Sequence, residues 1–285
     1  RKLFKMCCYI RNECFMPEEF LKAQFIVARS WLLANIERKH VLLGFDICND
    51  DCCQRYQGIL NTTKKSNKIS KLTFGQVITS DNKICDARYS KSCGGITESF
   101  ENVWVGNKIS YLTSIKDTNS KGIPYCSTDI IPDSSLKTYI GNIDEDGKYY
   151  RWNYKINHKD LIHSLKINFS LDVKKVLDIN PTKIGLSSRI IKLEIIFLNT
   201  DNRTENIKII SEYQIRKILS PSFLYSSAFT VNKIKDDFIL EGKGWGHGVG
   251  LCQIGALGMA LSKKEVTSIL NHYYPGTEIS TIYNK

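Results

Sequence analysis

The sequence has no long apolar run, and this absence is the first constraint on the protein. A membrane-spanning helix needs about 18 or more apolar residues in a row, and no such run occurs in the 285-residue chain. The longest apolar stretch is interrupted by Arg29, Asn35 and Glu37. With 42% hydrophobic and 24% charged residues, the composition is that of a globular chain able to bury a sizeable core.

Two further signals are missing at the level of motifs. No nucleic-acid-binding module is recognisable, and the glycine-rich segment 242–250 lacks the GK[ST] ending of a phosphate loop. The net charge of +11 nevertheless favours an anionic polymer, such as nucleic acid, anionic lipid or bacterial wall, or else reflects a lysine-rich solvated surface. Because no nucleic-acid-binding module is recognisable, we predict no nucleic-acid partner.

The chain also starts at Arg1 without a methionine or a signal-peptide pattern. We read it as a mature or trimmed chain, and expect any membrane contact to come only through an N-terminal anchor that is missing here.

Cysteine is abundant, with ten residues. Cys48, Cys52 and Cys53 lie within six positions, beside two aspartates. This cluster favours a metal site over a disulfide, because adjacent cysteines seldom both pair within one fold; free thiols are the alternative. Cys85 and Cys93 have a spacing that allows pairing with each other or with Cys126, and the sequence does not choose.

The hydrophobic pattern predicts an α+β fold with two lobes around a cleft. Residues 17–36 read as a helix so apolar that it belongs in the core, with Pro17 suited to its first turn. The middle of the chain changes character and predicts a hairpin from 190–198 and 206–210. We expect residues 132–221 to form a mostly β lobe inserted between the two halves of the first lobe, 1–131 and 222–285.

One carboxylate, Glu13, stands just ahead of the apolar helix among apolar neighbours. Desolvation there is expected to raise its pKa, which suits a general acid at neutral pH. A helix-capping carboxylate is the alternative interpretation.

The glycines of segment 242–250 alternate with other residues and allow a ligand or another backbone to approach closely. Trp245 and His247 in this segment could stack on a sugar and hydrogen-bond it. The alternative is a loop packed tightly against the core.

Taken together, six blocks in this order resemble the stage II sporulation protein D and amidase-enhancer family. The helix block at 19–31, EFLKAQFIVARSW, is similar to the family's E-A-L-K-A-Q-A-x-A-A-R-T-Y signature. The others are 44–58, 87–97, Trp104 with Tyr111 and Leu112, 244–256 (GWGHGVGLCQIGA), and 272–276 (HYYPG). The middle of the chain carries less of the match.

The resemblance implies lytic cleavage of peptidoglycan glycan strands. Glu13 matches the family's catalytic glutamate, although its spacing to the helix is about one residue shorter than usual; Glu18 and Glu19 are rivals, and Glu19 fits the helix signature instead. Lys22 and Arg29 match basic positions that would orient the substrate or the glutamate. Tyr89 and Tyr111 match positions expected to contact sugars, and we add Trp245 and His247 to this substrate-binding set.

A single glutamate is sufficient for a lytic transglycosylase, whereas most glycosidases need two carboxylates. Some relatives also bind zinc through one histidine and two cysteines after the helix, which implies His40, Cys48 and Cys53 here, with Cys52 as a further ligand. Zinc would then hold this loop beside Glu13.

The resemblance places the protein in the bacterial envelope, outside the cytoplasmic membrane. We expect the helix, the cysteine loop and the His247 segment to meet at the cleft. A non-catalytic wall-binding enhancer of an N-acetylmuramoyl-L-alanine amidase is the main alternative, with that amidase as a partner. A zinc-dependent hydrolase is a third possibility.

Overall fold

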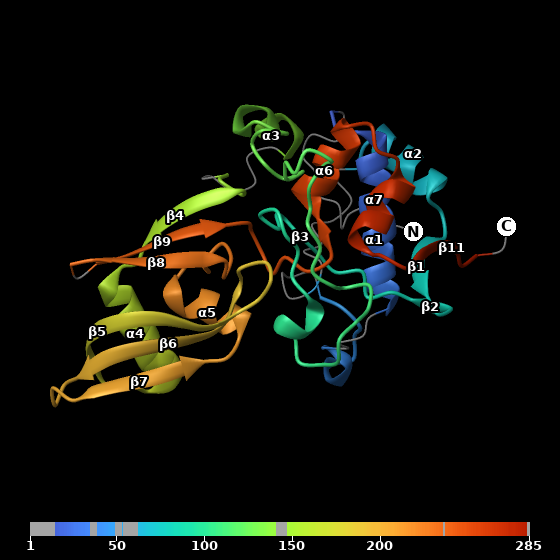
Figure 1. The fold of residues 1–285 in the computed structure, drawn as a ribbon. Helices are drawn as coiled ribbons and strands as arrows, with labels where there is room; N and C mark the ends of the chain where they lie inside the picture. The colour runs from blue at the N-terminus through green and yellow to red at the C-terminus, as the bar shows by residue number, and fades with distance from the viewer. Residues whose placement is uncertain are drawn as a thin grey trace.

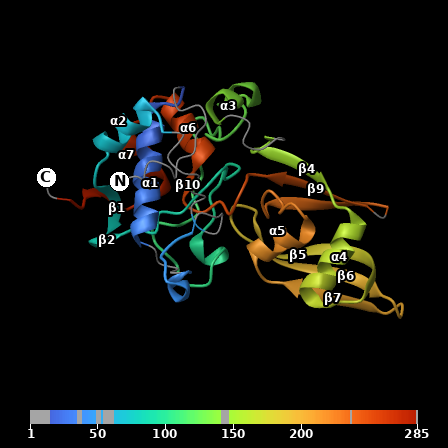
Figure 2. The same ribbon diagram turned by 180° about the vertical axis from the view of Figure 1, so that it is seen from behind.

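The computed structural model describes residues 15–34, 39–48, 53, 62–140, 147–235 and 237–283. Helices and strands are mixed along the chain, which confirms the predicted α+β class. Two lobes are visible in Figure 1 and, from behind, in Figure 2. Each lobe has its own cluster of buried hydrophobic side chains.

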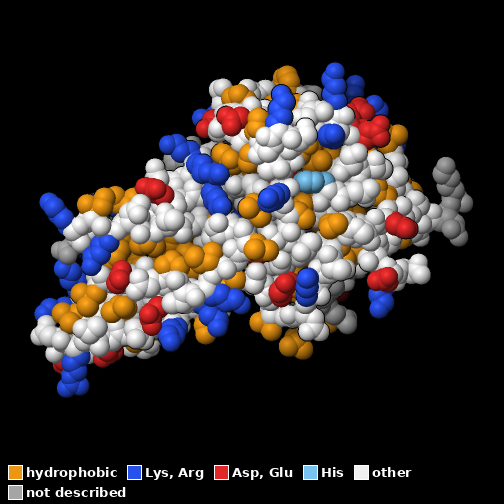
Figure 3. All heavy atoms as spheres, viewed as in Figure 1, with side chains coloured by type: hydrophobic (Ala, Val, Ile, Leu, Met, Phe, Trp, Pro, Cys, Tyr) orange, Lys and Arg blue, Asp and Glu red, His pale blue; other side chains and the backbone are white. Residues whose placement is uncertain are grey.

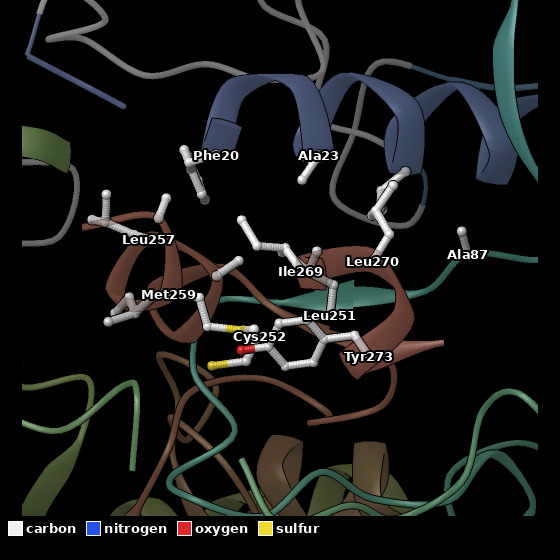
Figure 4. Close-up of a cluster of buried hydrophobic side chains, with 14 of the residues drawn as sticks. Phe20, Ala23, Ala87, Leu251, Cys252, Leu257, Met259, Ile269, Leu270 and Tyr273 are labelled. Atoms are coloured by element: carbon white, nitrogen blue, oxygen red, sulfur yellow. The ribbon is translucent and has the colours of Figure 1, made fainter. Parts of the chain in front are cut away.

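Helix α1 (Glu18–Ala34) is the centre of the first lobe. Ten of the eleven residues from Phe20 to Ser30 are buried, all except Lys22, so the helix is buried on all sides, as its all-round apolar sequence predicts. The helices α2 (Lys64–Leu72), α6 (Gln253–Leu261) and α7 (Val266–Tyr273) pack against it. Figure 4 shows Phe20 and Ala23 of α1 facing Leu257, Ile269 and Leu270 of α6 and α7. Both ends of the described chain therefore build one core.

Short strands complete the first lobe. Strand β1 (Gln76–Ser80) lies between β11 (Glu278–Thr281) and β2 (Lys83–Ile84) in an antiparallel sheet. Strand β3 (Tyr89–Ser90) pairs in parallel with β10 (Leu251–Cys252), which leads directly into α6. The short helical turns η2 (Val41–Leu43) and η3 (Phe100–Asn102) and the helix α3 (Asp133–Ile140) lie between these elements in sequence.

The second lobe consists of two three-stranded antiparallel sheets and two helices. Strand β9 (Asp237–Lys243) lies between β4 (Arg151–Lys155) and β8 (Phe229–Ile234). Strand β6 (Ile190–Asn199) lies between β5 (Val173–Ile184) and β7 (Thr204–Ile209), so the predicted hairpin is present. Helices α4 (His158–Phe169) and α5 (Glu212–Leu219) pack together beside this second sheet.

The boundaries of the second lobe differ from the predicted 132–221. Leu136 and Ile140 of α3 belong to the first core, whereas Phe229 and Phe238 belong to the second. The second lobe thus runs from β4 to β9, so both of its boundaries lie about twenty residues later in the sequence than predicted. The physical reason is strand pairing: β8 and β9, which follow residue 221, complete the sheet that β4 begins.

Among the described helices, none is long and apolar enough to cross a membrane. On the face shown in Figure 3, lysine and arginine side chains are spread over both lobes and outnumber the acidic ones. This agrees with the net charge of +11.

Candidate functional site

The glycine-rich loop between β9 and β10 is the joint between the two lobes. Gly248 and Gly250 have φ values of +76° and +70°, a left-handed conformation that favours glycine. A Cβ at Gly248 would lie 2.3 Å from the Arg189 Cζ atom, and one at Gly250 would lie 2.1 Å from the Arg88 carbonyl oxygen. The alternating glycines therefore allow close packing, which favours the packed-loop interpretation of this segment.

Arg189 of the second lobe forms hydrogen bonds to this loop. Arg189 lies in the turn between β5 and β6, directly before β6, and its side chain is 1% exposed. Its Nη1 donates to the Cys93 carbonyl (3.2 Å) and its Nη2 donates to the Gly246 carbonyl (3.0 Å). One buried guanidinium thus joins the β5–β6 turn to two segments of the first lobe.

Glu98 makes a second polar contact across the same joint. Its Oε2 accepts from the Ser187 hydroxyl (2.5 Å) in the β5–β6 turn, and its Oε1 accepts from Asn102 Nδ2 (2.8 Å). The carboxylate is fully buried, so these hydrogen bonds replace the water that it loses. Glu98 is therefore a structural carboxylate at the lobe junction.

Trp245 lies in an aromatic stack at the joint. Its ring stacks on Tyr225 of the second lobe (4.4 Å between centroids, 23° between planes) and meets Tyr149 at 4.9 Å. Its backbone N–H donates to the Ser92 carbonyl (2.8 Å). The indole is half-buried, so its exposed part is what remains for the sugar contact predicted from the sequence.

His247 lies on the first-lobe side of the loop. Its ring meets Trp104 edge-on at 4.8 Å, and its Nδ1 accepts from the Val249 N–H (3.1 Å). Desolvation, together with the nearby Arg88 and other arginines, holds the pKa of His247 well below its usual range. The imidazole is therefore neutral, with Nδ1 as acceptor and Nε2 as the site of the proton.

Arg88 packs against the pair of rings formed by Trp104 and His247. Its guanidinium lies 4.4 Å from the Trp104 ring centroid and its Nε donates to both carboxylate oxygens of Asp86, at 2.8 and 2.9 Å. The pair is buried. Arg88, Trp104 and His247 thus form one contiguous group of a cation and two rings.

Tyr89 and Tyr111, the two tyrosines predicted to contact sugars, are both half-buried in the first lobe. Tyr89 lies in β3 and pairs with Leu251 of β10. The Tyr111 hydroxyl accepts from the Asp86 N–H (3.1 Å), and burial raises its pKa. Burial also raises the pKa of the neighbouring Cys85 thiol to about 11. The Tyr111 hydroxyl is therefore held by the core rather than directed outward.

On helix α1 the acidic side chains make structural contacts. Glu18 forms an exposed ion pair with Lys68 (2.7 Å), and hydrogen bonding to Lys68 lowers the Glu18 pKa. Glu19 accepts from the Lys22 ammonium (2.5 Å) through one oxygen and from the Val266 N–H (2.8 Å) at the start of α7 through the other. A general acid needs a carboxyl group that is easily protonated near neutral pH, so the lowered pKa of Glu18 argues against that role. Glu19 is engaged by Lys22 and by the N-terminus of α7.

The two basic residues predicted to orient the substrate differ in their surroundings. Lys22 is half-buried and paired with Glu19. Arg29 is 3% exposed, and its Nη1 donates to the carbonyls of Thr73 (2.8 Å) and Gln76 (2.7 Å). These bonds hold β1 against α1 and give Arg29 a structural role. A substrate contact for either residue stays a prediction.

The predicted zinc ligands after α1 come together. One ligand atom from each of His40, Cys48 and Cys53 lies within 4.8 Å of the others, and His40 Nε2 is 3.3 Å from Cys53 Sγ. The His40 ring stacks on Phe45 at 4.8 Å. A histidine and two cysteines at this separation fit the nitrogen and sulfur ligands that zinc prefers. Cys52 and the predicted catalytic residue Glu13 lie outside the described residues.

Several important residues were not predicted from the sequence. Glu98 follows the block at 87–97 directly and could have been noticed as its next residue. Arg189 lies in the middle of the chain, where no motif signals it. Asp117 and its partner His272, 3.1 Å apart, are likewise far apart in sequence. Their roles depend on contacts that no local pattern encodes.

Comparison with known proteins finds two family models that match this chain. The family model described as stage II sporulation protein matches residues 13–80, and a domain of unknown function (DUF8618) matches residues 98–250. An uncharacterized protein of Brachyspira hyodysenteriae is 30% identical over 267 residues, which covers 92% of this chain and 61% of that protein.

Two relatives from Bacillus subtilis carry functional names. The amidase enhancer is 26% identical and aligns with 92% of this chain but only 38% of its own length. Stage II sporulation protein D is 25% identical over 93% of this chain and 69% of its own length. The chain thus spans less than two thirds of the first two relatives. The match to the family model and the alignment of both Bacillus subtilis relatives with more than nine tenths of this chain show that the chain is a member of the stage II sporulation protein D and amidase-enhancer family.

Proposed function

We propose that the chain is a peptidoglycan lytic transglycosylase that cleaves the MurNAc–GlcNAc bond, with Glu13 as general acid and then general base. The observation that carries this proposal is the engagement of both rival carboxylates near the start of α1. Glu18 is paired with Lys68, and Glu19 is shared between Lys22 and the N-terminus of α7. Glu13 is the remaining acidic residue of this segment.

The reaction needs only one carboxyl group. Glu13 would donate its proton to the glycosidic oxygen as the bond from that oxygen to C1 of MurNAc breaks. The resulting carboxylate would accept the proton of the C6 hydroxyl of the same sugar as O6 bonds to C1. The products are a free GlcNAc hydroxyl and a 1,6-anhydro-MurNAc end, with no water consumed. The proton returns to Glu13, so its pKa has to lie near the working pH.

The other described residues would serve binding. The exposed part of Trp245, stacked on Tyr225, offers an apolar face to a sugar ring. A neutral His247 offers hydrogen-bonding capacity without adding charge. Lys22, Tyr89 and Tyr111 remain proposed substrate-binding residues on the strength of their motif positions, and so does Arg29, although its described bonds are structural.

We propose zinc as the ion of the His40, Cys48 and Cys53 group, with Cys52 as a further ligand. Zinc would link the loop that follows α1 and stabilise its conformation. The basic surface suits an anionic wall polymer. We propose that the protein works in the bacterial envelope, outside the cytoplasmic membrane.

The deciding experiment compares Glu13→Gln with Glu18→Gln on purified peptidoglycan, with muropeptides analysed by mass spectrometry. Glu13→Gln should bind wall material as the unmodified chain does but release no 1,6-anhydro ends. Glu18→Gln, a matched change five residues away on an exposed ion pair, should retain the activity. Equal release by the Glu13→Gln variant would refute the assignment.

The second candidate function is a wall-binding enhancer of an N-acetylmuramoyl-L-alanine amidase. A relative bearing the name amidase enhancer favours it. In that case the unmodified chain releases no anhydro ends but increases the release of stem peptides by an added amidase. A zinc-dependent hydrolase would instead incorporate oxygen from labelled water into its product.

A further inference from the structure

A second group of metal-ligating side chains lies in the core of the first lobe, apart from the His40 loop. Its members are Cys93, Asp117, Cys126 and Cys252, and one ligand atom from each lies within 4.8 Å of all the others. All four residues are at most 2% exposed. They come from four separate segments, so the fold itself brings them together.

The distances suit a tetrahedral ion. Cys93 Sγ lies 3.7 Å from Cys126 Sγ and 3.1 Å from Asp117 Oδ2. Zinc–sulfur bonds of about 2.3 Å in a tetrahedral site separate two sulfurs by about 3.8 Å. Since all the ligand atoms lie within 4.8 Å of one another, three sulfurs and one carboxylate oxygen are close enough to share one ion.

The carboxylate is oriented by an outer layer of hydrogen bonds. Asp117 Oδ1 accepts from the Tyr273 hydroxyl (2.8 Å) and lies 3.1 Å from His272 Nε2. The other oxygen, Oδ2, is the one that faces the Cys93 thiol. Ligating carboxylates in metal sites are commonly held by hydrogen bonds of this kind.

Backbone N–H groups point at two of the sulfurs. Cys252 is the N-cap of α6, and its Sγ accepts from the N–H of Gly255 (3.3 Å) and from that of Cys93 (3.1 Å). Cys93 Sγ accepts from the Gly95 N–H (3.3 Å). Backbone N–H groups placed in this way can hydrogen-bond to metal-bound sulfur atoms.

Close approach of α6 to the group depends on a glycine. A Cβ at Gly255 would lie 2.4 Å from Asp117 Oδ2, 2.3 Å from the Tyr273 hydroxyl oxygen and 3.1 Å from Cys252 Sγ. Figure 4 shows Cys252 and Tyr273 beside each other at the edge of the core around α6 and α7. Any side chain at this position would occupy the space around the ligand atoms.

A disulfide explains these residues less well. One disulfide joins two sulfurs, so it leaves the third buried thiol unexplained. A divalent ion gives all four a role and offsets the charge of the carboxylate. Arg189, whose Nη1 donates to the Cys93 carbonyl (3.2 Å), adds positive charge next to the group.

We propose that Cys93, Asp117, Cys126 and Cys252 form a second, structural zinc site that is independent of the His40 loop and of the proposed function. With four protein ligands the coordination is closed, so the ion stabilises the fold rather than activating water. On binding, the thiols release their protons to solvent and each sulfur donates an electron pair to the ion. The site would tie α6 to three loop segments of the first lobe.

The test removes the first site and asks whether metal remains. In the full chain carrying Cys48→Ser, Cys52→Ser and Cys53→Ser, purified under reducing conditions, we expect one zinc per chain. Exchange for Co²⁺ should give thiolate-to-cobalt charge-transfer absorption in the near ultraviolet. Adding Cys126→Ser should abolish both signals. Adding Cys85→Ser, a buried cysteine of the same lobe outside the group, should leave both intact.

The proposal is overturned if the triple variant carries no metal, or if Cys85→Ser and Cys126→Ser lose it equally. Should Cys126→Ser fail to fold, X-ray absorption at the zinc edge of the triple variant decides. A ligand shell dominated by sulfur supports the site. A shell of nitrogen and oxygen alone, or an intact mass showing a disulfide within the group, contradicts it.

Discussion

Gln253 Nε2 donates a hydrogen bond to Gln24 Oε1 over 3.2 Å, although the two residues are 229 positions apart in the sequence. Gln24 lies in the α1 block and is 1% exposed, and Gln253 begins α6 in the block that follows the His247 loop. Among the described residues, Gln24 Nε2 is buried without a hydrogen-bond partner. The contact therefore joins the two most characteristic sequence blocks inside the core.

Replacing Gln253 tests that connection. Gln253→Leu should lower the free energy of unfolding by about 1–3 kcal/mol, because the buried Gln24 carbonyl loses its donor. Gln24→Leu combined with Gln253→Leu should cost less than the sum of the single changes. Urea denaturation of the four proteins measures this. The exposed Gln214→Leu change on α5 should stay within about 0.5 kcal/mol of the unmodified chain, and strict additivity would argue against the contact.

Substitutions at two glycines with the same backbone φ angle can distinguish the cost of backbone strain from the cost of steric overlap. Gly248 and Gly276 both have φ of +76°, but only Gly248 has a neighbour, Arg189, where a Cβ would lie. Gly276→Ala should cost about 1–2 kcal/mol for the left-handed conformation. Gly248→Ala should cost about 1–3 kcal/mol more, since Arg189 has to move. Thermal and urea unfolding provide the comparison, and equal costs would show that Arg189 does not pack on the glycine.

The guanidinium of Arg189 donates to two backbone carbonyls, so even a substitution by lysine should lower the stability of the protein. Arg189→Lys keeps the charge but cannot reach the Cys93 and Gly246 carbonyls together. We expect a loss of about 1–3 kcal/mol in the free energy of unfolding, because a buried carbonyl is left without its donor. Arg203→Lys, at an exposed turn of the same lobe, serves as the matched control. A similar small effect for both changes would exclude the proposed role at the joint.

His247 should make stability depend on pH. Its pKa is lowered in the folded protein, so the unfolded chain binds the proton more readily. The stability that depends on a neutral ring is complete above the unfolded pKa of about 6.5 and is lost as pH falls from there to the folded pKa. The loss is about 1.4 kcal/mol for each pH unit within that window.

Urea unfolding at several pH values measures this dependence. His247→Gln should flatten the decline below pH 6.5, whereas His163→Gln, at an exposed position of α4, should leave it unchanged. An identical decline in the His247→Gln protein would assign the pH dependence to other groups.

Local sequence patterns were sufficient for the elements with strong periodicity. The apolar stretch around Phe25 predicted a buried central helix, and the 190–210 region predicted the β6–β7 hairpin, both of which are present. The grouping of His40 with Cys48 and Cys53 was implied by the family resemblance, and the structure places one ligand atom of each within 4.8 Å of the others. Local patterns failed at the lobe boundary, because β8 and β9 join a sheet that begins some eighty residues earlier.

The sequence by itself determined the fold class, the central helix and the family, because short-range periodicity and the order of motifs are written along the chain. Only the tertiary structure decided that Arg189 and Glu98 close the joint, that Arg29 bonds backbone carbonyls, and that Cys93 and Asp117 face each other. Such contacts form between segments that are brought together by burial of the two cores. Burial depends on the whole chain, so no local window of sequence specifies them.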